Sequence, residues 1–142
     1  MKRISHETNM AKHNEIGRIG EDVAVDFLRQ KGFRIVLRNF RKPYGEIDII
    51  ALDPEGRLRF VEVKSVSYET GRAGGQSVSH ETFRPEENVH SAKVKSLIRV
   101  IGAYLVSHET DAEWQFDVMA VFLDTTAKKA KIRHLKNVVL GS

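Results

Sequence analysis

Residues 45–64 read GEIDIIALDPEGRLRFVEVK, and this stretch decides both the fold and the candidate site. Two runs rich in Ile, Val and Phe, 47–51 and 58–64, flank the sequence DPEG at 53–56. β-Branched and aromatic residues favour strands, and Asp-Pro-x-Gly is typical of a type I turn followed by a left-handed glycine. The stretch therefore predicts an antiparallel β-hairpin.

The turn also sets the register expected for this hairpin. With the turn closed across 53–56, the count back along the two strands puts Asp48 opposite Glu62. By the same count Glu46 lies opposite Lys64, and a slip of one residue would exchange the two faces. The expected faces are an apolar core layer of Ile47, Ile49, Val61 and Val63, and a charged layer of Glu46, Asp48, Glu62 and Lys64 that also carries Phe60.

The charged layer has the composition of a phosphodiesterase site. Two carboxylates that face each other repel unless a cation or a proton lies between them, and Mg²⁺ or Mn²⁺ prefers such oxygen ligands. Lys64 points the same way as Glu62, where its ammonium would orient or deprotonate a water or neutralise a phosphate. The alternative is an ordinary solvated hairpin face, in which Lys64 and Glu46 form a cross-strand ion pair.

The rest of the chain predicts one α/β domain over residues 1–142. We expect helices and strands in the order αβββαββ, with a mixed central sheet flanked by helices. The N-terminal residues 1–13 are expected to be flexible and the polar stretch 65–88 to be a mobile loop. The expected helices are 14–31 and 89–106, and the expected strands are 33–37, 47–51, 58–64, 115–123 and 131–135, with a tail at 137–140.

Composition narrows the class of protein. Apolar residues make up 41% and charged residues 30% of the chain, as in a globular domain, and the absence of cysteine excludes disulfides and thiolate-bound zinc. We expect no membrane partner and a cytoplasmic location, since no apolar run could span a bilayer and residues 1–12 lack a signal-peptide core. The net charge of +4 suits a polyanionic partner such as nucleic acid, or a merely basic soluble protein.

The string Ser-His-Glu-Thr recurs at 5–8, 79–82 and 107–110. The separations are irregular, which excludes a solenoid repeat. Adjacent His and Glu on loops make a poor fixed metal site, so these strings are interpreted as polar surface loops.

Five segments in this order resemble the uncharacterised YraN-type family. They are Gly-Glu at 20–21, Arg-Asn at 38–39, GEIDII at 45–50, FVEVK at 60–64 and Phe-Asp-Val at 116–118. The resemblance covers most of the chain. It implies the restriction-endonuclease-like PD-(D/E)XK fold, close to that of archaeal Holliday-junction resolvases.

The resemblance also implies roles for individual residues. Asp48 and Glu62 would be the metal-binding acidic pair, with the Val63 carbonyl as a third ligand. Lys64 would be the catalytic lysine, and Glu21 a helix-borne acid that approaches the same site. The alternative for Glu21 is a solvated acid favoured by the helix dipole. Asp117 would be structural or would support the site from a neighbouring strand.

The first functional hypothesis is a Mg²⁺-dependent (or Mn²⁺-dependent) endonuclease acting on DNA, branched or structured DNA included. The second is a nucleic-acid-binding module that keeps the nuclease fold but cleaves poorly or not at all, since Val66 and Gln115 stand where many family members carry arginine. A homodimer would suit the symmetric cutting of a junction. A serine or cysteine hydrolase is disfavoured because there is no cysteine and no Gly-x-Ser-x-Gly motif. The residues expected to contact the nucleic-acid backbone are Arg38, Arg41, Lys42, Lys93, Lys95 and Arg99.

Overall fold

The computed structural model describes residues 2–70 and 91–140. These residues form an α/β structure whose elements follow one another as α1 (Lys2–Gln30), β1 (Arg34–Lys42), β2 (Gly45–Leu52), β3 (Leu58–Tyr68), α2 (Ser91–Ser107), β4 (Trp114–Asp124) and β5 (Lys129–Leu135). Neither helix of the described part of the chain combines the length and apolar character needed to cross a membrane.

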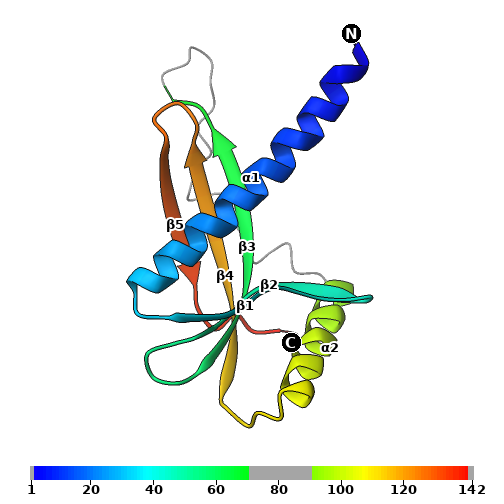
Figure 1. The fold of residues 1–142 in the computed structure, drawn as a ribbon, viewed down its shortest axis with the longest axis vertical. Coiled ribbons are helices and arrows are strands. Elements are labelled where there is room, and N and C mark those ends of the chain that lie inside the picture. The colour runs from blue at the N-terminus through cyan, green and yellow to red at the C-terminus, as the bar shows by residue number, and fades with distance from the viewer. Residues whose placement is uncertain (1, 71–90, 141–142) are drawn as a thin grey trace.

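The strands form one mixed sheet in the order β1-β2-β3-β4-β5. All neighbouring pairs are antiparallel except β3 and β4, which run parallel from Leu58↔Trp114 to Tyr68↔Asp124. A parallel pair needs a crossover connection, and α2 lies within that connection. In Figure 1, α1 lies diagonally across β3, β4 and β5, whereas α2 lies beside the β1–β2 ribbon.

Both faces of the central strands of the sheet are buried, because each helix covers one of them. Phe60 and Val61 are adjacent on β3 and both are fully buried, but they belong to different clusters. The α2-side cluster contains Phe60, Leu97, Val100, Ile101, Tyr104, Phe116 and Val118, and the α1-side cluster contains Ala24, Val25, Leu28, Ile49, Val61, Met119 and Val121.

The expected division of the hairpin into one apolar and one charged layer is confirmed for Ile49, Val61 and Val63, which all pack on the α1 side, and is wrong for Phe60 and Ile47. Phe60 belongs to the α2-side core instead of a charged layer. Ile47 joins the same α2-side cluster, whereas Ile49 packs on the α1 side. Phe60 is buried because α2 covers that face of β3. Ile47 changes sides because β2 coils: it pairs with β3 only at its end and turns away with β1 towards α2, as Figure 1 shows.

The predicted hairpin register is confirmed where the two strands pair. The pairs run from Leu52↔Leu58 to Ile49↔Val61. The Asp53 amide donates to the Arg57 carbonyl at 2.9 Å, and Gly56 has φ +86°, as the type I turn with a left-handed glycine requires. Asp48 and Glu62 are the next residues beyond the paired stretch.

Several element boundaries differ from the prediction. The first helix begins at Lys2 instead of residue 14, and β1 continues to Lys42 instead of ending at 37. Because β1 is an edge strand with mostly exposed side chains, its second half lacks the apolar pattern of a strand. Strand β3 runs on to Tyr68, since it pairs with β4 along its whole length. The remainder of the expected loop, 71–88, lies outside the described residues.

The Ser-His-Glu-Thr string at 107–110 caps α2. The His108 amide donates to the Tyr104 carbonyl at 3.0 Å and the Thr110 amide to the Leu105 carbonyl at 3.2 Å. Glu109 has φ +48°, which is the left-handed conformation that commonly ends a helix. The string at 5–8 lies within α1 instead of a loop, and the string at 79–82 lies outside the described residues.

Candidate active site

The candidate site lies where β2 and β3 part. If the ladder continued beyond Ile49↔Val61, the Val63 amide would donate to the backbone carbonyl of Ile47. Instead it donates to Asp48 Oδ2 at 2.8 Å. The side chain of Asp48 thus replaces a strand as the hydrogen-bond partner of β3, which holds its carboxylate at the fork.

The carboxylate of Asp48 is electrostatically unfavourable in its charged form. Burial raises its pKa to about 6, although the hydrogen bond from Val63 works against this rise. The negative charges of Glu21, Glu62 and Glu46 are part of the cause of this rise. A cation at this position would relieve both effects.

Glu62 projects from β3 with a side chain that is only 12% exposed. Its Oε1 lies 3.3 Å from Lys64 Nζ and forms a second ion pair with Lys93 of α2. Its Oε2 is buried and finds no hydrogen-bond partner in the described part of the chain. A buried carboxylate oxygen without a partner costs free energy, so this oxygen is available to a ligand.

Glu21 approaches the same region from α1. Its carboxylate lies 3.9 Å from Arg38 Nη2, and its charge is close enough to Asp48 to raise the pKa of that residue. Burial raises the pKa of Glu21 itself, Arg38 lowers it, and Glu46 raises it again. Glu21 is therefore part of the acidic cluster and not a fully solvated acid.

The residues present fit a hard divalent cation by their chemistry. Asp48 and Glu62 offer carboxylate oxygens. Oε2 of Glu62 is unpaired among the described residues, and burial disfavours the charged form of Asp48. Over residues 2–70 and 91–140, no group of three or more His, Cys, Asp or Glu side chains is arranged to hold a metal ion. The predicted ligand set of Asp48, Glu62, the Val63 carbonyl and Glu21 stays a prediction.

The proposed cross-strand ion pair between Lys64 and Glu46 is wrong. Glu46 accepts a hydrogen bond from Arg41 Nε at 2.9 Å, and Lys64 pairs with Glu62 on its own strand. Because β2 leaves β3 beyond Ile49, the two side chains are not held opposite each other. Lys64 is consequently available to the site.

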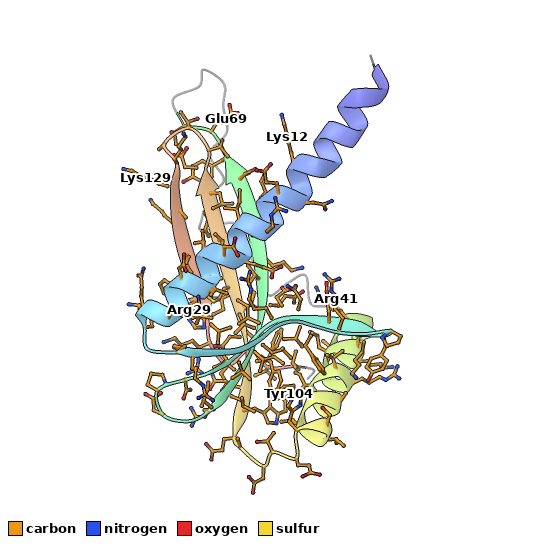
Figure 2. All side chains as sticks on the ribbon, in the orientation of Figure 1. Lys12, Arg29, Arg41, Glu69, Tyr104 and Lys129 are labelled. Atoms are coloured by element: carbon orange, nitrogen blue, oxygen red, sulfur yellow. The ribbon has the colours of Figure 1, made fainter. Side chains whose placement is uncertain are left out.

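The basic residues predicted from the sequence divide into two groups. Arg38, Arg41 and Lys93 lie beside the acidic cluster. Arg41 and Lys93 pair with Glu46 and Glu62, and Arg38 donates to Asp22 at 2.8 Å and lies 3.9 Å from Glu21. Arg41 projects from the β1–β2 ribbon in Figure 2. The other three have different surroundings: Lys42 lies over the Phe40 ring, Arg99 over the Tyr44 ring, and Lys95 is exposed.

Gly20 is a site residue whose role sequence reasoning missed. It lies on the buried side of α1, where a Cβ would overlap the Ser65 hydroxyl and lie 2.8 Å from Ser65 Cβ. Only a glycine lets α1 approach β3 this closely, and Glu21 and Lys64 are the chain neighbours of the two contacting residues. A glycine in the middle of a helix is the signal that could have revealed the contact, because it costs about 1 kcal/mol there relative to alanine.

Asp117 belongs to a separate buried network. Its carboxylate accepts hydrogen bonds from Arg59 at 2.7 Å, Gln115 at 2.9 Å and the Asn137 amide at 2.9 Å, and it contacts His134 at 2.8 Å. Burial alone would raise its pKa, but these partners, His134 foremost, lower it to about 2. The network joins β3, β4 and β5, which supports the structural interpretation of Asp117.

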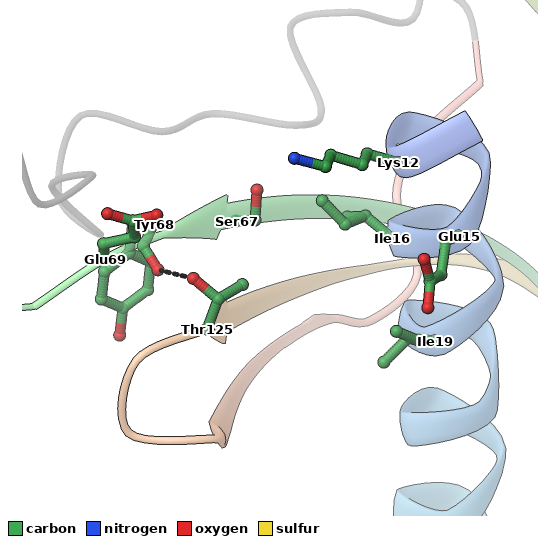
Figure 3. A pocket seen from close by; sticks show the side chains of 8 residues that line it. All are labelled: Lys12, Glu15, Ile16, Ile19, Ser67, Tyr68, Glu69 and Thr125. Carbon is green, nitrogen blue, oxygen red and sulfur yellow. Dashed lines mark hydrogen bonds between the residues drawn. The ribbon is translucent and has the colours of Figure 1, made fainter. Parts of the chain in front are cut away.

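A pocket of about 540 Å³ lies apart from these residues, between α1 and the far end of β3. Figure 3 shows Lys12, Ile16 and Ile19 of α1 on one side of it, and Ser67 and Thr125 on the other. None of the predicted site residues lines this pocket. The candidate site is thus the strand fork and not this hollow.

Comparison with known proteins places the chain in a family. The model of "Uncharacterised protein family UPF0102" matches residues 20–121, a range that holds the candidate site from Glu21 to Lys93. A UPF0102 protein of Flavobacterium psychrophilum is 36% identical over 128 residues, which are 90% of this chain and 96% of the relative. One from Alkaliphilus oremlandii is 40% identical over 128 residues, covering 88% and 97%. One from Chlorobium phaeobacteroides is 37% identical over 132 residues, covering 89% and 95%. The chain belongs to family UPF0102.

Proposed function

We propose that this member of family UPF0102 is a metal-dependent endonuclease that hydrolyses phosphodiester bonds in DNA, branched or structured DNA included. The observation that carries the proposal is the strand fork. Asp48 has a raised pKa there, and Glu62 has one oxygen paired with lysine and the other buried without a partner in the described residues. Such a cluster is costly for folding and is of use to a cation-dependent reaction.

Each residue of the fork has a role in this proposal. Asp48 and Glu62 would hold Mg²⁺ or Mn²⁺, with the Val63 carbonyl and Glu21 as further ligands. The cation would polarise the scissile phosphate and acidify a water. Lys64, whose ammonium lies 3.3 Å from Glu62 Oε1, would orient that water and neutralise charge on the phosphate.

The reaction is a hydrolysis and balances without an oxidant or reductant. The oxygen of a water bonds to phosphorus while one ester P–O bond breaks. One proton of the water ends on the departing sugar oxygen, and the products are a phosphate monoester and an alcohol.

The surroundings of the fork support a polyanionic substrate. Arg38, Arg41 and Lys93 lie beside the acidic cluster, and the chain carries a net charge of +4. Lysine and arginine contacts to phosphates give affinity with little sequence preference, which suits a nuclease that recognises DNA structure. A restriction-endonuclease-like core, a cytoplasmic location and a homodimer that cuts two strands symmetrically belong to the same proposal.

A cleavage assay with matched variants tests the proposal. Purified protein is incubated with labelled linear duplex, single-stranded and four-way-junction DNA, with Mg²⁺, Mn²⁺ or EDTA. Asp48→Asn and Lys64→Ala remove site groups, and Lys129→Ala removes a positive charge at the far end of the sheet, where Figure 2 labels it. We expect metal-dependent cleavage by the wild type and Lys129→Ala, and a loss of 100-fold or more, roughly, in both site variants.

Two outcomes would reject the proposal. Binding without cleavage on every substrate would favour the non-catalytic nucleic-acid-binding module. Cleavage that persists in Asp48→Asn and Lys64→Ala would place the reaction at a different site.

A further inference from the structure

Lys93 holds a position that its expected role as a contact to the nucleic-acid backbone does not explain. It lies in the first turn of α2, and its ammonium pairs with the same oxygen of Glu62 that Lys64 contacts. One carboxylate oxygen thus faces two ammonium groups, whereas the other has no partner in the described part of the chain. One ammonium group would balance the single negative charge of Glu62, so the second ammonium is not needed for that purpose.

The charge of Lys93 is stabilised by the acids that would hold a metal ion. Its ammonium pairs with Glu62, whose side chain is only 12% exposed, and it is also attracted by the charge of Asp48. The ammonium therefore lies in the electrostatic field of both carboxylates. A divalent cation that bound these carboxylates would repel it.

We propose that Lys93 is a displaceable counter-ion, which neutralises Glu62 before a divalent cation binds and turns to a substrate phosphate once the bound cation repels it. The inference rests on the proposed function, since it assumes that the cation binds at Asp48 and Glu62. It makes Lys93 a residue that couples metal binding to DNA binding.

Lys93 is better suited to this movement than Lys64. Lys64 is two residues from Glu62 on a strand that pairs with β4 at Ala120, so the two side chains stay close whatever is bound. Lys93 reaches Glu62 from a separate element, and its side chain is 34% exposed. Its long flexible stem lets the ammonium leave the carboxylate without any change in the backbone.

Titration calorimetry with Mn²⁺ alone, without DNA, tests the first half of the inference. Removal of the competing ammonium in Lys93→Met is expected to tighten Mn²⁺ binding by roughly three- to tenfold. A change of this size in the dissociation constant corresponds to the free energy of a partly buried ion pair. Lys93→Arg keeps the charge and is expected to bind Mn²⁺ like the wild type. Lys129→Met removes a distant charge and is expected to change nothing.

Binding of a short duplex in EDTA and in Ca²⁺ tests the second half. Because Glu62 holds Lys93 when no cation is bound, Lys93→Met should lose DNA affinity in Ca²⁺ and not in EDTA. An equal loss in both conditions would show a plain phosphate contact and overturn the inference. So would Mn²⁺ affinity that is unchanged or weaker in Lys93→Met.

A further variant separates this inference from the proposed function. If the wild type binds Mn²⁺, Glu62→Gln does not, and Lys93→Met matches the wild type, then only the role of Lys93 is wrong. If the wild type and every variant fail to bind Mn²⁺, the proposed function and this inference both fail.

Discussion

Two clusters of charged side chains lie on the same sheet and differ in how completely they are paired. Asp117 is fully buried, and Arg59, Gln115, His134 and the Asn137 amide all contact its carboxylate. At the strand fork, Asp48 accepts a single described hydrogen bond, from Val63, and one oxygen of Glu62 has no described partner. The first cluster lowers the pKa of its carboxyl group and the second raises it.

The difference separates structural from functional charge. A buried carboxylate that is fully hydrogen-bonded stabilises the fold as long as its partners remain. A half-buried carboxylate with too few partners costs stability, and the missing partner is a ligand. Glu62 on β3 and Asp117 on β4 are close in the sheet, but the first belongs to the candidate site and the second stabilises the fold.

The largest expected effect is the loss of stability in Asp117→Asn. The substitution leaves Arg59 with a buried charge that, among the described residues, only Asp53 at 2.9 Å still neutralises. We expect the free energy of unfolding to fall by about 3–5 kcal/mol, the usual cost of breaking a buried pair. Urea unfolding measures the change, with Asp22→Asn in an exposed ion pair as the control. A loss below about 1 kcal/mol would remove the contrast between the clusters.

The second expected effect is that Asp48 and Asp117 make the stability of the fold depend on pH in opposite directions. Asp48 has a folded pKa of about 6 against 3.8, so the folded state binds the proton more tightly and stability falls as the pH rises through that window. Asp117 has a folded pKa of about 2, so its contribution is present above 3.8 and is lost as the pH falls towards 2.

Unfolding of variants as a function of pH measures these two slopes. Asp48→Asn should gain roughly 1–3 kcal/mol on the wild type as the pH rises from 4 to 7, because the variant lacks the charge penalty. The disadvantage of Asp117→Asn should instead shrink as the pH falls from 4 to 2. A flat difference for Asp48→Asn would contradict the view that its carboxylate lacks partners.

A smaller effect is expected from Gly20→Ala, which tests the close approach of α1 at the fork. The added methyl group would overlap the Ser65 hydroxyl, and overpacking of this kind costs about 1–3 kcal/mol. The double variant Gly20→Ala with Ser65→Gly should recover part of the loss, as measured by urea unfolding. If Gly20→Ala is neutral or the second change deepens the loss, this contact does not position the helix.

How far the sequence predicts this structure depends on how local each interaction is. The hairpin register followed from the turn at 53–56, where neighbouring residues determine the geometry, and it brought Asp48 and Glu62 to the fork. The assignment of faces failed at Phe60, because a strand covered by helices on both sides has no solvated face. A prediction based only on the alternation of apolar and charged residues assumes that one face of the strand is exposed to solvent.

Contacts between segments that are distant in the sequence could not be predicted from it. Lys93 was expected as a DNA contact, and only the packing of α2 brings it to Glu62. The Asp117 network draws its partners from β3, β5 and the segment after β5, and no spacing in the sequence relates them. The continuation of β3 to Tyr68 likewise depends on its pairing with β4.

The thermal shift produced by Mn²⁺ tests the central claim most directly, since a ligand that binds the folded state raises its Tm. The account predicts that Mn²⁺ raises the Tm of the wild type and of Asp117→Asn, and leaves the Tm of Asp48→Asn and Glu62→Gln unchanged. A Tm that does not move in the wild type, or that rises equally in all four proteins, would contradict the assignment of the strand fork as the cation site.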